Sequence, residues 1–258
     1  MPNYRLSQYS YSMNFRFSLL LGSLVTTTAA QAQTNGVQDG GAAQANLNAL
    51  TAGAPTMLPR GGSYGVKGSP YADSRWLPAQ IKLVNSRPLA PVPLKYDVLE
   101  HRLLMRPLNR GNDSLLLDDR QVVSFVLQEP ASALGPARPR LFRRFSEAPN
   151  ERQRQDYVEV LNDGKYTLLK HHLKSMKKAD YQGAYSNDQH YDQIEDKSVY
   201  YLRTPQAGLQ PVKLGLKPLQ AAAPSLAGAL KTAVATQKPK TEADWAAVLR
   251  ALEPAPAK

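Results

Sequence analysis

The chain has 258 residues, and its 32 Lys and Arg against 21 Asp and Glu give a formal net charge of +11 at pH 7. Hydrophobic residues make up 42% of the chain, which is too many for a wholly disordered protein, and no apolar run reaches the roughly 18 residues of a membrane-spanning helix. The sequence contains no Cys, so disulfide scaffolds, Cys-ligated metal centres and thiol nucleophiles are excluded. This length predicts one domain with flanking segments.

Residues 1–32 are predicted to form a secretory signal peptide. Arg16 supplies a cationic start, 18–25 an apolar core, and Ala30-Gln31-Ala32 a small-x-small cleavage site, which are the three features that the export machinery reads. Met13 is a candidate start of translation, because a signal peptide does not need the polar, Tyr-rich residues before it. We therefore expect an exported protein that is periplasmic, secreted or peripheral to the outer membrane, with no transmembrane helix after cleavage.

Residues 33–66 are predicted to be a disordered linker. The segment is rich in Ala, Gly, Asn, Gln and Thr, and a chain of this composition buries too little apolar surface to fold on its own. Its larger aliphatic side chains are few, chiefly Leu47, Leu50, Met57 and Leu58. Order is expected to begin at the turn near Lys67.

An antiparallel β domain is predicted over 67–215. Alternate residues from Val92 to Val98 are apolar, and a two-residue period places them on one face of a strand. Asp163-Gly164 predicts a tight hairpin with a type I′ turn, because both residues tolerate positive φ. The expected strands are 80–84, 92–98, 99–106, 121–128, 156–161, 166–173, 199–203 and 211–214.

Residues 216–253 are predicted to form C-terminal helices, over 224–236 and 241–252, with Thr241 as an N-terminal cap. Trp245, Val248, Leu249 and Leu252 lie at helical spacing and predict a stripe that packs on the sheet. The tail 254–258 is expected to fray. The fold class is therefore mainly β (α+β), an antiparallel meander or half-barrel of about 8 to 10 strands with two C-terminal helices packed on it.

Several segments, in this order, resemble a family of uncharacterised exported β-rich proteins of Gram-negative bacteria. The resemblance covers roughly 68–252, and it implies a signal peptide, a β-rich body and no assigned activity. The chain departs from the family in a Pro/Arg-rich stretch over 130–154 and in a long N-terminal linker. The segments that carry the resemblance are Gly68-Ser69-Pro70-Tyr71, Trp76-Leu77-Pro78, Val92-Pro93-Leu94-Lys95-Tyr96-Asp97, Tyr157-Val158-Glu159-Val160-Leu161 with Asp163-Gly164-Lys165 and Leu168-Leu169-Lys170, and Tyr200-Tyr201-Leu202.

Histidines offer the main candidate for metal chemistry. His171 and His172, with His190 and Asp192, could supply nitrogen and oxygen ligands to a zinc-like ion. Adjacent residues of a strand point to opposite faces, so only one of the first pair could join such a site. We therefore favour structural roles for these residues and predict neither a metal site nor a cofactor. His101 is expected to be a solvated cross-strand partner.

Two further patterns suggest catalysis only weakly. The run 61–65 matches G-x-S-x-G, but no apolar strand precedes it and Gly68 and Pro70 oppose a following helix, so the nucleophile turn has no context. The acid pairs at 118–119 and 195–196 could serve glycoside hydrolysis only if they faced one another across a substrate. We predict no catalytic residue.

A basic loop is the main candidate binding feature. Guanidinium groups bind carboxylates and phosphates in bidentate fashion, so an Arg-rich loop could engage lipopolysaccharide phosphates, anionic lipid or a cell-wall polymer. A polar, Tyr-rich insertion over 174–197 is a second candidate for a ligand-facing loop. The proposed anion-binding side chains are Arg138, Arg140, Arg143, Arg144, Arg152 and Arg154.

These observations favour an exported, non-enzymatic envelope protein that binds or has a structural role. Its expected partner is an anionic envelope component or another envelope protein, and nucleic acid is not expected. An alternative is a carrier or sensor that holds an apolar ligand in a pocket lined by strands 92–98 and 121–128. A metal-dependent hydrolase is a weaker alternative.

Overall fold

The computed structural model describes residues 32–57, 65–106, 113–133, 135–179 and 191–253. Its main feature is an eleven-stranded antiparallel sheet in the order β1-β6-β5-β4-β3-β7-β8-β9-β10-β13-β14. The sheet stays open, with β1 and β14 at its edges, so the predicted class of an antiparallel β protein with helices at the C-terminus is confirmed. Its strands are β1 (Thr56–Met57), β3 (Leu77–Leu83), β4 (Val92–Asp97), β5 (Arg102–Met105), β6 (Ser114–Leu117), β7 (Val122–Glu129), β8 (Arg138–Arg144), β9 (Tyr157–Asn162), β10 (Thr167–His171), β13 (Val199–Thr204) and β14 (Gly208–Val212).

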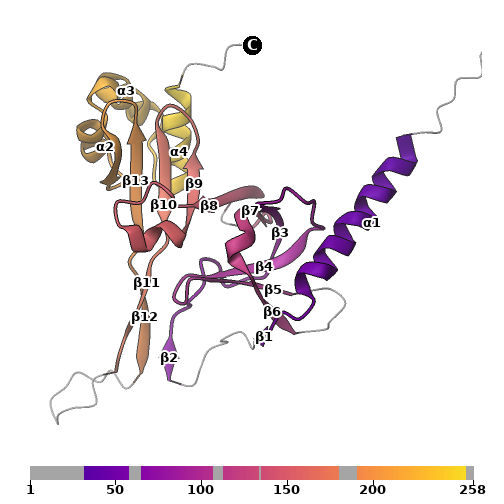
Figure 1. Ribbon diagram of the computed structural model, residues 1–258. Helices are drawn as coiled ribbons and strands as arrows, with labels where there is room; N and C mark the ends of the chain where they lie inside the picture. The colour runs from indigo at the N-terminus through magenta and orange to yellow at the C-terminus, as the bar shows by residue number, and fades with distance from the viewer. Residues whose placement is uncertain (1–31, 58–64, 107–112, 134, 180–190, 254–258) are drawn as a thin grey trace, which may run out of the picture.

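A smaller sheet extends away from the large one (Figure 1). In it, β12 pairs antiparallel with β11 and parallel with β2. The chain also forms four α-helices and three short 3₁₀ turns among the described residues. The bounds are β2 (Val66–Lys67), β11 (Lys174–Lys177), β12 (Asp192–Asp196), α1 (Ala32–Thr51), α2 (Leu216–Ala222), α3 (Ala227–Gln237), α4 (Glu242–Ala251), η1 (Asp119–Gln121), η2 (Glu151–Gln155) and η3 (Pro224–Leu226).

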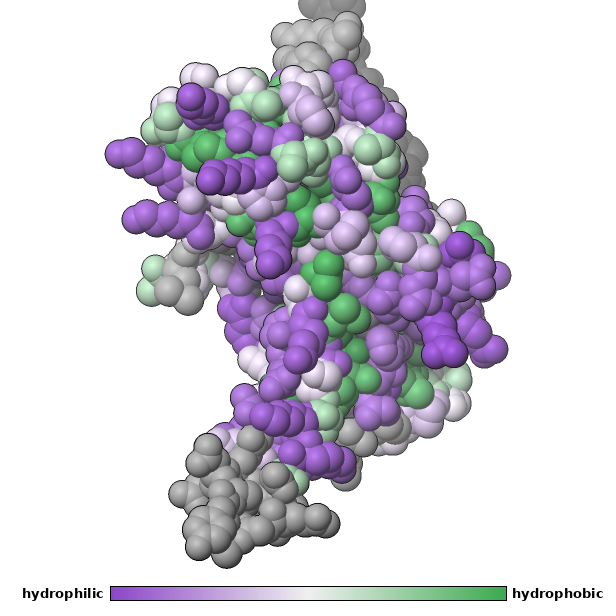
Figure 2. Space-filling model, turned by 90° about the vertical axis from the view of Figure 1, so that its left-hand side faces the viewer, coloured by the Kyte–Doolittle hydropathy of each residue, from purple (hydrophilic) through white to green (hydrophobic). Residues whose placement is uncertain are grey.

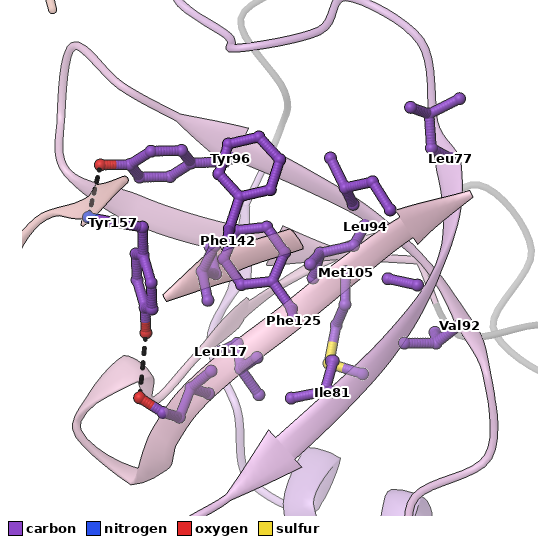
Figure 3. Packing of buried hydrophobic residues seen from close by; sticks show 14 of the residues in the cluster. Leu77, Ile81, Val92, Leu94, Tyr96, Met105, Leu117, Phe125, Phe142 and Tyr157 are labelled. Carbon is purple, nitrogen blue, oxygen red and sulfur yellow. Dashed lines mark hydrogen bonds between the residues drawn. The ribbon is translucent and has the colours of Figure 1, made fainter. Parts of the chain in front are cut away.

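The N-terminal half of the sheet is built around an aromatic and aliphatic core. The predicted alternation from Val92 to Val98 is confirmed, because its apolar residues are all buried in this core. Four rings from β4, β7, β8 and β9 meet there: Phe125 stacks on Phe142 at 4.9 Å, and Tyr96 lies edge-on to Tyr157 (Figure 3). The Tyr157 hydroxyl donates to the carbonyl of Val122 at 3.3 Å. These contacts tie β7, β8 and β9 to the preceding meander.

Helices α2, α3 and α4 cover one face of β9, β10, β13 and β14, and we call this unit the C-terminal lobe (Figure 1). The predicted stripe on α4 is confirmed, since Trp245, Val248 and Leu249 are buried against the sheet. Thr241 forms the N-terminal cap, and Asp244 completes a capping box. On the other face of the same strands, Phe145, Ala148, Val158, Leu169 and Tyr201 form a small separate cluster.

The linker predicted over 33–66 differs from the structure. Helix α1 occupies its first part, and Leu47 is buried in the core while Leu50 packs against it. The backbone N–H of Ala90 donates to the carbonyl of Ala43 at 3.3 Å, which ties the helix to the body. The prediction from composition gave too little weight to Leu47 and Leu50, which lie at i and i+3 and bind one end of the helix to the core. The predicted signal peptide and the tail 254–258 lie outside the described residues.

Several strands have no counterpart in the sequence predictions. β6 was not predicted, and β8 lies where the sequence suggested a Pro/Arg-rich loop. The polar insertion 174–197 contains β11 and β12, while its central residues 180–190 lie outside the described part. β8, β11 and β12 escape the search for alternating apolar residues because they carry charged side chains, whereas β6 is a short run of three leucines without alternation.

The hairpin predicted at Asp163-Gly164 is present, but its turn is not type I′. Neither residue has a positive φ, and the register shifts between Leu168 and Leu169. Gly164 instead lies close to the end of the Glu253 side chain: a Cβ atom at this position would lie 1.8 Å from a carboxylate oxygen, so the carboxylate would have to move. That carboxylate accepts hydrogen bonds from the backbone N–H of Tyr166 and the side chain of Asn162.

Candidate functional site

The predicted basic loop is strand β8 followed by η2, and most of its arginines pair with carboxylates of the same chain. Alternate residues of β8 share one face of the sheet: Arg138, Arg140, Phe142 and Arg144. The positive charges are therefore spread along the length of a strand. The pairs are Arg138–Glu129, Arg140–Glu159, Arg143–Glu147, Arg144–Asp119 and Arg154–Glu151. The stretch predicted as a basic loop is therefore mostly a strand, and binding of an external anion by these arginines stays a prediction. Only Arg152 has no carboxylate partner among the described residues.

Arg140 is the centre of a buried ion-pair network. Its guanidinium binds both oxygens of Glu159 at 2.8 Å, and it also donates to Asp73 at 3.2 Å. Asp73 in turn binds Arg75, and the second Glu159 oxygen contacts His172 Nε2 at 2.8 Å. These bonds connect the loop before β3 with β8, β9 and the end of β10.

Opposing effects set the pKa values in this network. Burial raises the pKa of Glu159, but the hydrogen bonds from Arg140 and His172 outweigh it and hold the pKa well below its usual range. Burial lowers the pKa of His172, against the opposing hydrogen bond to Glu159. The network therefore contains a carboxylate that stays ionised and a histidine that resists protonation, which suits a structural ion pair more than a proton-transfer site.

A second unit joins one carboxylate to two histidines, of which His171 is buried and His101 is half exposed. Asp156 accepts from His101 Nδ1 at 2.8 Å and contacts His171 Nε2 at 2.9 Å. Burial raises the pKa of Asp156, but the hydrogen bonds of the two histidines lower it to about 2. The hydrogen bond to Asp156 raises the pKa of His101. The expectation of a solvated His101 is confirmed, because its side chain is 52% exposed, but its placement in a strand is wrong: it occupies the β4–β5 turn with a φ of 53° and pairs with Asp156.

The candidate metal ligands do not come together in the described part of the chain. His171 contacts Asp156 on one face of the sheet and His172 contacts Glu159 on the other, as the strand period predicts. Asp192 accepts from the backbone N–H of Ala179, and His190 lies outside the described residues. Within the described ranges, no three His, Asp or Glu side chains form a group that could hold a metal ion.

The paired acids have local roles. Asp118 caps η1 and binds Arg120, while Glu195 and Asp196 pair with Lys197 and Lys174. Most of the G-x-S-x-G run, 61–64, lies outside the described residues.

The interior in which the carrier hypothesis placed an apolar ligand is filled by side chains. Inward-facing residues of β4 and β7, such as Leu94 and Phe125, pack directly together in the core (Figure 3). The packing of these side chains does not favour a pocket between the two strands, and the carrier alternative stays a prediction.

An open groove of about 520 Å³ lies on the C-terminal lobe between β13, β14 and the start of α4. Tyr200 and Trp245 contribute aromatic surface, and Lys213 and Lys240 contribute positive charge. Glu242 also lines it, where one carboxylate oxygen accepts from Lys170 Nζ at 2.6 Å and from the Tyr200 hydroxyl. Burial and this neighbouring carboxylate raise the pKa of Tyr200 above its usual value. The hydroxyl therefore remains a hydrogen-bond donor.

The surface around this groove carries unpaired positive charge. Residues 199–253 contain seven Lys and Arg against three Asp and Glu. All three acids are engaged: Glu242 as above, Asp244 by the backbone at Lys240 and Thr241, and Glu253 in the β9–β10 hairpin. Figure 2 views the molecule from the side of α2 and α3, where long hydrophilic side chains project beside hydrophobic surface. Five exposed lysines there have no carboxylate partner among the described residues: Lys213, Lys217, Lys231, Lys238 and Lys240.

None of the described helices is long and apolar enough to cross a membrane. A comparison of the chain with protein-family models, with curated proteins and with solved structures finds no match. The assignment of function therefore rests on the site itself.

Proposed function

We propose that the protein is an exported, non-enzymatic envelope protein that binds an anionic envelope component through the C-terminal lobe. The surface that binds it consists of the groove beside Tyr200 and Trp245 together with the five unpaired lysines. One observation carries the proposal: the arginines of β8 are mostly neutralised within the fold, whereas these lysines form no ion pair within the described ranges, and only Lys240 has a nearby carboxylate, that of Asp244. The excess positive charge of the lobe is therefore available to an external anion.

The arrangement suits an anionic polymer or lipid surface. Lysine is a strongly hydrated point charge on a flexible stem, so a group of lysines follows a spread-out anionic surface without fixed geometry. The aromatic surface of Tyr200 and Trp245 in the groove adds amphipathic contact area. Export to the envelope, which the residues 1–32 predict, is part of the same proposal, and it would place this surface beside anionic lipids and glycans.

Binding of the full chain to lipid vesicles tests the proposal. We expect sedimentation with vesicles that contain phosphatidylglycerol, weak binding to phosphatidylcholine alone, and a decline of binding with salt, because the Debye length shrinks to about 10 Å at 0.1 M. Each lysine near an anionic surface contributes about 1 kcal/mol, so the double variant Lys213→Gln/Lys240→Gln should bind about thirtyfold more weakly.

The matched control neutralises two exposed cations in the other half of the sheet, Lys82→Gln/Arg87→Gln. It makes the same change in net charge, and we expect it to keep most of the binding. Equal losses in the two double variants would show that only total charge matters and would remove the proposed surface.

A further inference from the structure

Two positive side chains lie on the face of the N-terminal strands that points away from the hydrophobic core. Leu94 and Tyr96 of β4 face that core, so Lys95 between them faces the opposite side, and only 9% of this lysine is exposed. Arg106 follows β5 directly, and its backbone N–H donates to the carbonyl of Pro93 at 2.9 Å. The two residues therefore lie on neighbouring strands.

Aromatic rings surround the two cations. Lys95 Nζ lies 4.7 Å from the ring centre of Tyr71 and 4.9 Å from that of Trp76. The guanidinium carbon of Arg106 lies 4.6 Å from the same Trp76 ring. Ring faces attract cations but carry no net charge. Within the described part of the chain no carboxylate forms an ion pair with Lys95 or Arg106.

The neighbourhood also contains buried polar atoms that lack a hydrogen-bond partner in the described structure. Arg106 Nε is one of them, and Ser114 Oγ is another. Leu115 and Leu117 face the core, so Ser114 of β6 faces the side of Lys95. Met105 pairs with Leu115, and the register continued by one residue sets Ser114 opposite Arg106. Buried polar groups nearly always have a partner, so these orphan atoms together indicate a ligand.

Burial lowers the pKa of Lys95, and repulsion from Arg106 lowers it further, against a weaker attraction from Asp73. An anion bound between the two cations would remove this repulsion. Within this cluster, charge, hydrogen-bond donors and aromatic walls are therefore all arranged for a negative group that the described chain does not supply.

We propose that Lys95, Arg106 and Ser114 bind a doubly charged oxyanion, a phosphate or sulfate group, beside the indole of Trp76. Two cations match the charge of such a group, the guanidinium donates in a fixed fork, and the serine hydroxyl supplies a further donor. The site lies on different strands from the groove of the C-terminal lobe, so it goes beyond the proposed function. Failure of either proposal leaves the other standing.

Titration of the full chain with inorganic phosphate at constant ionic strength tests the site. The chain has two tryptophans, so the variant Trp245→Phe leaves Trp76 as the only tryptophan reporter. We expect a saturable fluorescence change with phosphate and with sulfate, and much weaker binding of acetate, which has one charge. Lys95→Met and Arg106→Met should each weaken phosphate binding by about tenfold or more, because each removes a charge-assisted contact.

Lys82→Met is the matched control, since Lys82 is exposed on β3, and it should bind phosphate as the parent does. Lys95→Arg keeps the charge and should retain binding, which keeps the test decisive if Lys95→Met does not fold. Lys95→Met should also lose the rise in melting temperature that phosphate produces in the parent, because a ligand stabilises only a protein that binds it.

Three results would overturn the proposal. The first is the absence of saturable binding of phosphate or sulfate. The second is equal phosphate affinity in the parent, Lys95→Met and Arg106→Met, and the third is acetate binding as tight as phosphate.

Discussion

Removal of the charge of Glu159 is the sharpest test of the buried network. The side chains of Glu159 and Arg140 are only 3% and 8% exposed, and two bonds of 2.8 Å join them. Glu159→Gln keeps the shape of the side chain but leaves Arg140 with Asp73 as its remaining carboxylate partner. Breaking a buried ion pair on one side costs about 3–5 kcal/mol. Because Asp73 remains, we expect a loss near 3 kcal/mol, the lower end of that range.

The assay is urea unfolding at pH 7, followed by tryptophan fluorescence and by circular dichroism. In a thermal scan of the same variant, a loss of about 3 kcal/mol in the free energy of unfolding would lower the melting temperature by roughly 6–12 °C. Glu151→Gln is the matched control, because its carboxylate is 84% exposed and pairs only with Arg154 at the surface. An exposed pair contributes less than about 1 kcal/mol.

A double-mutant cycle with Arg140→Met completes the test. If the two side chains stabilise the fold through one another, the double variant should be much less destabilised than the sum of the single variants. A cost of Glu159→Gln as small as that of Glu151→Gln, with additive effects in the cycle, would refute the view that this network holds β8, β9 and the loop before β3 together.

Three further outcomes are expected. The pKa of Asp156 is lowered from 3.8 to about 2, so the stability that its carboxylate contributes is present above pH 3.8 and is lost as the pH falls through 2. In the variant Asp156→Asn, the stability measured by circular dichroism should depend less on pH between these two values. The pKa of His101 is raised above 6.5, so its contribution to the free energy of unfolding is full below pH 6.5 and is lost as the pH rises through the folded-state pKa. In the variant His101→Gln, the free energy of urea unfolding should no longer fall over this pH range. Gly164→Ala should destabilise the parent by about 1 kcal/mol, the net value of a hydrogen bond, because it displaces the carboxylate of Glu253; it should cost little in a Glu253→Ala background, and equal costs in the two backgrounds would contradict the close contact.

Apolar periodicity predicted most of the sheet, and it succeeded where one face of a strand is buried in the core. β3 and β4 show this pattern, and the capped, striped helix α4 was predicted from Thr241 onward. The same criterion missed β8, because its buried face carries Arg140 beside Phe142 and a charged residue scores as exposed. The pairing that buries Arg140 involves Glu159 and Asp73, which are 19 and 67 residues away in the sequence. No local pattern predicts such a partner.

The sequence also could not show which basic residues have an ion-pair partner in the folded chain. Sequence alone shows a dense group of arginines and a scattered set of lysines, and density favoured the arginines as the binding surface. In the folded chain, the planar guanidinium makes bidentate contacts that allow it to be buried, as in Arg140, whereas the compact, strongly hydrated ammonium group usually stays in water. Arginines are therefore the cations that a fold most readily neutralises internally, and the exposed lysines carry the remaining charge. Lys95 departs from this rule, since it is buried without a carboxylate partner among the described residues, and that departure is the reason to expect a ligand beside it.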